Sequence, residues 1–146
     1  MDVLQLLKNE LKERQSDVSA FIDGPSAYQN WAQIARHLKA HLTLELEYLL
    51  PELAAVSPKQ DAVLQRLETD LVNLRLQLNA LGFDNNPKPD QVTDLRDAMG
   101  RHVALIEDRI LPLMRQRIST ADREELYDAM QDAKQDIIRS TLGLAI

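Results

Sequence analysis

The sequence predicts an all-α protein, an antiparallel four-helix bundle with an additional C-terminal helix. Glycine is scarce, with 4 in 146 residues, and most of the chain consists of residues that favour or tolerate a helix. Apolar residues recur at steps of three and four positions and do not alternate, which is the period of a helix. Such narrow apolar seams suit helices that pack nearly antiparallel.

The first helix is expected over roughly residues 2–22, because turn chemistry at Asp23-Gly24-Pro25 breaks the pattern. Its apolar stripe consists of Leu4, Leu7, Leu11, Val18 and Phe21, with Ile22 alongside. The second helix is expected to begin near Ser26. Its inward stripe consists of Trp31, Ile34, Leu38, His41, Glu45 and Tyr48. Trp31 and Tyr48 are expected to be core aromatic residues whose polar edges find a partner.

The third helix follows Ser57-Pro58, and an eight-residue loop over 82–89 separates it from a fourth helix that starts around Asp90. The third stripe is all leucine: Leu64, Leu67, Leu71, Leu74, Leu78 and Leu81. The fourth consists of Leu95, Met99, His102, Ile106, Ile110 and Leu113. Pro51 and Pro112 fall late in the second and fourth helices, and each is expected to kink or end its helix.

A cap at Ser119-Thr120-Ala121-Asp122 is expected to open a fifth helix beside or across the bundle. Its apolar side consists of Leu126, Met130, Ala133 and Ile137. We expect one domain over residues 1–146, with the bundle at about 2–118 and the C-terminal helix at about 120–142.

Composition narrows the function classes. With no cysteine, the chain has no disulfides, thiolate ligands or iron–sulfur clusters. The net charge is −6 and no lysine/arginine cluster occurs, so we expect no nucleic-acid partner. The N-terminus lacks a basic region followed by an apolar run, and no apolar stretch approaches the ~20 residues that span a bilayer. We therefore expect a cytoplasmic protein that does not bind membranes.

Two segments of the chain echo each other, His41–Pro51 and His102–Pro112. Each opens on a histidine and closes on a proline preceded by two aliphatic residues. Imidazoles at matching depths on two helices are how a bundle builds a metal site. The echo fails at one position, because Glu45 follows His41 by four residues while the equivalent residue after His102 is Ile106.

His41, Glu45 and His102 lie on the apolar seams, so we expect their side chains to be buried together. A carboxylate and two imidazoles buried without partners would be costly, so they must bind one another, a metal or trapped water. His41 and Glu45 lie one helical turn apart and face the same way. His37 lies one turn earlier at the edge of the stripe, where a partly exposed residue is expected more often than a ligand.

These segments resemble a known family. His41–Pro51, with its glutamate four residues after the histidine, looks like the second helix of a hemerythrin-like (HHE cation-binding) domain, and His102–Pro112 resembles the fourth. Residues Arg123–Lys134 look like the tail helix that many members carry. The resemblance implies a di-iron site with histidines from all four helices and bridging carboxylates from the second and fourth.

Carried over position by position, the resemblance implies a damaged site. The first-helix histidine falls at Leu11, the third-helix histidine at Leu71 and the fourth-helix carboxylate at Ile106. A slip of one residue would substitute Asp70 or Glu107, but these two lie off the seams. Three side chains supply too few donors for two irons, so we expect no dinuclear oxygen-binding centre.

The remnant His41, Glu45 and His102 leaves two readings open. It is either a buried polar cluster without any cofactor, which we favour, or a site for one iron or zinc ion. The corresponding functions are a repurposed scaffold or regulatory protein, acting on a protein partner or as a homodimer, and a metal-binding module. An enzyme is the weaker third class, because it needs open coordination positions and the sequence shows no nucleophile with its base, phosphate loop or hydride-cofactor fingerprint.

Overall fold

The computed structural model of the chain describes residues 2–24, 31–83 and 86–141. Within these residues the protein is all-α. The long helices are α1 (Val3–Asp23), α2 (Trp31–Leu44), α4 (Ala62–Leu81), α5 (Pro89–Leu105) and α7 (Thr120–Thr141). Helix α2 runs on through a π-helical turn, η1 (Glu45–Leu49), into α3 (Leu50–Ala55). Helix α5 does the same through η2 (Ile106–Ile110) into α6 (Leu111–Arg117).

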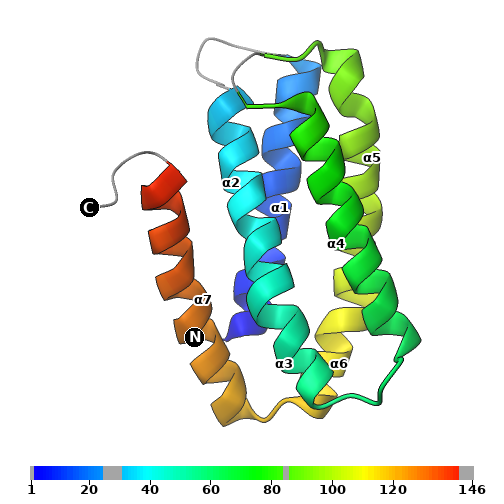
Figure 1. Cartoon of the computed structure of the whole chain (residues 1–146), viewed down its shortest axis with the longest axis vertical. Helices are drawn as coiled ribbons and strands as arrows, with labels where there is room; N and C mark the ends of the chain where they lie inside the picture. Colours follow the sequence, from blue (N-terminus) through cyan, green and yellow to red (C-terminus); the bar gives the residue numbers. More distant parts are fainter. Residues whose placement is uncertain (1, 25–30, 84–85, 142–146) are drawn as a thin grey trace.

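Four helical rods form an antiparallel bundle, and α7 lies outside it (Figure 1). Helix α1 packs against α2 and α5, and α4 packs against the same two helices. The order around the bundle is therefore α1, α2, α4, α5, with α2 and α5 on a diagonal. Helix α7 contacts α2, α1 and η1. The predicted fold class, a four-helix bundle with an additional C-terminal helix, is confirmed.

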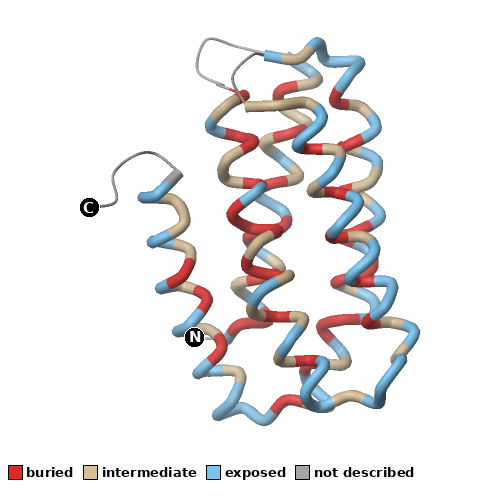
Figure 2. Tube along the Cα trace, viewed as in Figure 1, coloured by how far each residue is buried: buried red, intermediate tan, exposed pale blue. Residues whose placement is uncertain are grey.

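The predicted apolar stripes form the core of the bundle, as the buried segments facing its interior show (Figure 2). In each of the five helices, every residue of the stripe except the last is buried. The last members are only partly buried: Ile22, Tyr48, Leu81, Leu113 and Ile137. Burial of these seams is the main source of stability, because apolar area removed from water contributes about 25 cal/mol per Å².

Side-chain caps define where three helices begin. The Asp2 carboxylate accepts a hydrogen bond from the Leu4 amide at 3.0 Å, and Asp61 accepts one from Val63 at 3.0 Å. Ser119 Oγ accepts one from the Asp122 amide at 3.1 Å, which confirms the cap predicted there. The expected helix start at Ser26 and the expected end near residue 142 lie outside the described residues.

Trp31 joins the α4–α5 loop to the start of α2. Its indole Nε1 donates to the Gly82 carbonyl at 2.8 Å, so the expected partner for the polar edge of Trp31 is present. Gly82 follows α4 with φ +77°, a backbone conformation that glycine adopts without strain.

Pro51 and Pro112 were expected to kink or end their helices; that they end them is wrong, because both helices continue past the prolines. A proline ring clashes with the carbonyl four residues earlier. Here the helix widens by one residue before each proline. The Leu50 amide bonds to the Glu45 carbonyl and the Leu111 amide to the Ile106 carbonyl, both five residues back. The π turns accommodate the prolines and preserve the packing on either side.

We predict that replacing Leu71 by alanine lowers the free energy of unfolding by about 2–5 kcal/mol, because it leaves a cavity in the core. Leu71 is 0% exposed. Leu76 on the same helix is 62% exposed and provides the matched control, whose replacement by alanine should change stability by no more than about 0.5 kcal/mol. Urea denaturation of both variants measures the difference, and equal losses would contradict the observed packing of α4.

Candidate functional site

The structure brings the three candidate residues together inside the bundle. His41 lies in the last turn of α2, Glu45 opens η1 one helical turn later, and His102 lies in the last turn of α5. Their exposed fractions are 2%, 0% and 1%. We call these three residues the buried trio. Because α2 and α5 face each other across the bundle, the trio spans its centre.

Glu45 contacts both histidines of the trio. Nε2 of His102 lies 3.0 Å from Glu45 Oε1 and 3.1 Å from Oε2, so it donates to both oxygens of the carboxylate. Nε2 of His41 lies 2.6 Å from Oε2. That contact is short but lacks the alignment of a hydrogen bond, and both ring nitrogens of His41 are buried without a hydrogen-bond partner.

The electrostatics of the trio favour an ionised carboxylate. Burial raises the pKa of Glu45, but the charges of His102 and His41 and the hydrogen bonds from His102 outweigh it and lower the pKa to about 2. Burial likewise lowers the pKa of His102, but the Glu45 charge and hydrogen bond, with a contribution from Asp70, raise it above its ordinary value. The metal-free trio therefore holds an ion pair between His102 and Glu45, with the ring of His41 beside it.

The residues present do not fit a di-iron centre. Leu11, Leu71 and Ile106, which stand where the resemblance implies ligands, are 2%, 0% and 0% exposed and belong to the core. Asp70 and Glu107, the residues that a one-position slip would substitute, are only partly buried. The seams thus hold the aliphatic residues inside, and these residues have no atoms that bind iron.

A single metal ion is a closer match to the donors. Two imidazole Nε2 atoms and one carboxylate converge on one region of the core, and Nδ1 of each histidine has no hydrogen-bond partner. The carboxylate nevertheless fills the space between the rings. In residues 2–24, 31–83 and 86–141, no group of three or more His, Asp or Glu side chains has an arrangement ready to hold a metal ion.

Sequence reasoning missed three charged residues beside the trio. Glu10 and Arg14 of α1 are 7% and 9% exposed, and Glu10 Oε2 lies 4.0 Å from His41 Nδ1. Lys134 of α7 forms an ion pair with Glu10 Oε1. The available signal was spacing. Glu10 lies three residues after Leu7, and Arg14 three after Leu11, so both belong to the seam of α1.

His37 lies outside the trio. Its Nδ1 is 3.3 Å from Nη1 of Arg14, which donates to it, and its ring is partly buried. Burial, and then the charge of Arg14, lower the pKa of His37, so that the imidazole that accepts this hydrogen bond is neutral. Arg14 is also held by Asp17, whose Oδ2 lies 3.2 Å from Nε of the arginine. His37 therefore takes part in a polar network of α1 and not in the trio.

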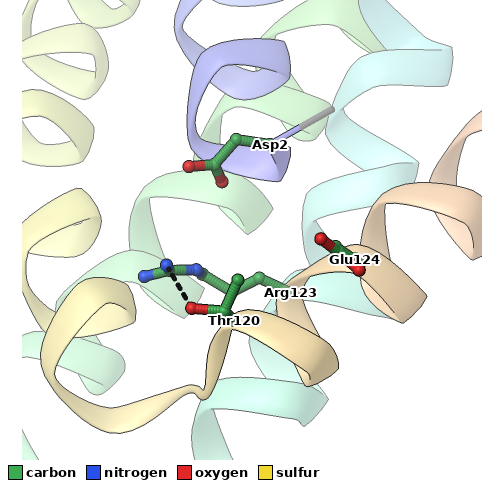
Figure 3. A pocket seen from close by; sticks show the side chains of 4 residues that line it. All are labelled: Asp2, Thr120, Arg123 and Glu124. Atoms are coloured by element: carbon green, nitrogen blue, oxygen red, sulfur yellow. Dashed lines mark hydrogen bonds between the residues drawn. The ribbon is translucent and has the colours of Figure 1, made fainter.

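A surface pocket of about 220 Å³ lies apart from the trio, between the start of α1 and the start of α7. It is lined by Asp2, Thr120, Arg123 and Glu124 (Figure 3). Arg123 Nη2 donates to Thr120 Oγ1 at 3.3 Å within the pocket. Its lining mixes both charges and includes no side chain of the trio.

We predict that Glu45→Ala lowers the free energy of unfolding by about 3–5 kcal/mol, because it leaves buried imidazoles without their shared partner. Glu47 in the same π turn is exposed, and Glu47→Ala is the matched control with an expected change within about 0.5 kcal/mol. Chemical denaturation at neutral pH measures both. Equal effects would show that the trio contributes nothing to stability.

We predict a bell-shaped dependence of stability on pH in the metal-free protein. The lowered pKa of Glu45 gives stability that is present above the ordinary value of 4.5 and lost as pH falls toward about 2. The raised pKa of His102 gives stability that is present below 6.5 and lost as pH rises through the folded-state value.

The variant His102→Gln isolates the alkaline limb, because its amide still donates to Glu45 but does not titrate. Urea denaturation across the pH range should show the wild type losing stability relative to this variant above 6.5. Taking this difference removes the contribution of His37, which is common to both proteins. A pH-independent difference would contradict the ion pair.

The chain was compared with known proteins. The family model described as the hemerythrin HHE cation-binding domain matches residues 2–114. No curated protein and no solved structure matched the chain. The matched region includes the whole bundle through most of α6, and with it all three residues of the trio. By this match, and in agreement with its helical architecture, the chain belongs to the hemerythrin HHE cation-binding domain family.

Proposed function

We propose that this protein is a hemerythrin-family bundle that has lost the complete di-iron/oxygen site and is non-catalytic. It acts through its surface, as a scaffold or as a regulatory or interaction protein. The observation that carries the proposal is the burial of Leu11, Leu71 and Ile106 in the core at three of the positions where the family resemblance implies ligands.

The proposal follows from donor chemistry. Two irons need more donor atoms than two imidazoles and one carboxylate supply, and leucine and isoleucine side chains fill the space that a bridging oxygen would require. The remaining carboxylate is neutralised by His102 at 3.0 Å. A buried charge that is paired and hydrogen-bonded in this way needs no metal.

The partner that we infer is a protein, either another chain or a second copy of this one, in the cytoplasm. A net charge of −6 disfavours binding to nucleic acid. No helix in the described part of the chain combines the length and the apolarity that crossing a bilayer requires.

A second candidate function is a metal-binding module that holds a single iron or zinc ion through His41, Glu45 and His102. One observation favours it. Nε2 of His41 is buried and has no hydrogen-bond partner, although it lies 2.6 Å from Oε2 of Glu45. Zinc or iron would need all three donors within about 2.0–2.2 Å of one point. Bound there, the ion would supply a Lewis acid or a structural crosslink between α2 and α5.

Metal analysis separates the two candidates. We predict that wild-type protein, after exposure to Fe(II) or Zn(II) and removal of free metal, retains no more metal than His41→Ala. The reason is that the ion pair already occupies the centre of the trio. The control variant is His37→Ala, which removes a histidine that lies outside the trio and should match the wild type in either case.

One ion per chain in the wild type and in His37→Ala, with none in His41→Ala, would overturn the metal-free proposal in favour of the single-ion module. Circular dichroism of the three proteins establishes that the bundle remains folded. If the wild type, His41→Ala and His37→Ala all retain the same background amount of metal, the single-ion metal-binding function is eliminated.

A further inference from the structure

Helix α7 lies outside the region that the family model matches, which ends at residue 114. It nevertheless packs on the elements that carry the trio and its neighbours, since it contacts α2, α1 and η1. His41 belongs to α2, Glu10 to α1 and Glu45 to η1. The C-terminal helix therefore covers the side of the bundle formed by α1, α2 and η1.

The face that α7 turns to the bundle is apolar with one charge in it. Leu126, Met130 and Ala133 are 6%, 1% and 8% exposed. Lys134 follows them with a side chain 24% exposed, and its ammonium pairs with Glu10 Oε1. This pair joins residues 124 positions apart in the chain.

Glu10 links this ion pair to the trio. Its second oxygen, Oε2, lies 3.9 Å from Nη1 of Arg14 and 4.0 Å from Nδ1 of His41. The side chain of Glu10 is 9% exposed, so α7 and the carboxylate together shield the Nδ1 edge of His41 from water. On the other side of Glu45, His102 lies on α5, which packs against α1 and α4.

Helix α7 contacts the bundle from one side only, through α2, α1 and η1. Beyond Lys134, Ile137 and Ile138 are only partly buried. Helix α7 lies outside the four-helix bundle, beside α2 (Figure 1). A peripheral helix that packs on a bundle through one face can open at lower free energy than the core of the bundle unfolds.

We propose that α7 is a lid over the buried trio, and that the ion pair between Lys134 and Glu10 is its latch. When α7 is docked, Glu10 is paired and His41 is sealed. When α7 opens, water and small solutes reach Glu10 and Nδ1 of His41, while His102 stays covered by α1 and α4. The lid controls access to His41 whether the trio is metal-free or holds an ion.

Histidine labelling tests the lid. Diethyl pyrocarbonate transfers an ethoxycarbonyl group to an accessible imidazole nitrogen, and peptide mass spectrometry gives separate rates for His41, His102 and His37. We expect Lys134→Glu, which places two carboxylates at the latch, to raise the labelling rate of His41 by roughly tenfold or more. The rate of His102 should stay unchanged, and α7 amides should exchange hydrogen faster than those of α4.

Two further variants keep the result interpretable. Arg139→Glu reverses a charge at an exposed position of the same helix. It should change neither the labelling rate of His41 nor the exchange rate of the α7 amides. Leu126→Ala loosens α7 at its other contact without changing any charge, and serves also if Lys134→Glu does not fold. It should raise the His41 rate in proportion to the faster exchange of the α7 amides.

Three outcomes would overturn the lid. The first is faster exchange in α7 without faster labelling of His41. The second is His102 labelling that rises in step with His41, because the whole bundle would then be opening. The third is unchanged exchange in α7 when the Lys134–Glu10 pair is broken, because the pair would then not be a latch.

Discussion

The hydrogen bonds between His102 and both oxygens of Glu45 are the interaction on which the interior of this bundle depends. Glu45 is 0% exposed, and a charge so deeply buried is tolerated only when it is paired and hydrogen-bonded. The bond joins α2 to α5, which lie on a diagonal and have few other contacts with each other. The apolar seams hold adjacent helices together, whereas this ion pair fixes the two helices that face each other across the core.

The two π turns have the same backbone but different side chains at the corresponding buried position. Both turns begin four residues after a histidine and end before a proline, and both first residues, Glu45 and Ile106, are fully buried. The backbone at the two places is alike, but only one side chain is charged. A single carboxylate suffices to balance one imidazolium. A second carboxylate at the position of Ile106 would add another buried acidic group, which would need its own proton or positive partner.

Most of the fold was predictable from sequence because its determinants are local. The seam of α4 and the cap at Ser119 follow from spacing and residue type, and the same spacing placed the trio inside. The Lys134–Glu10 pair was not predictable, because it joins residues 124 positions apart and depends on how α7 packs. The π turns were missed for a related reason. Local rules state that a proline disrupts a helix, but here the helix widens by one residue before Pro51 and Pro112 and continues past them.

The buried ion pair also has a structural role that an apolar core could not fill. Replacing a buried ion pair by well-packed aliphatic residues is often neutral or stabilising, so stability alone does not account for the trio. A seam of aliphatic residues alone could shift by one helical turn against its neighbours while burying nearly the same area. Glu45 reaches His102 at 3.0 Å in one register only, since a shift of one turn moves the carboxylate by about 5.4 Å. We infer that the trio specifies how η1 and α5 are aligned, a role that requires no bound metal.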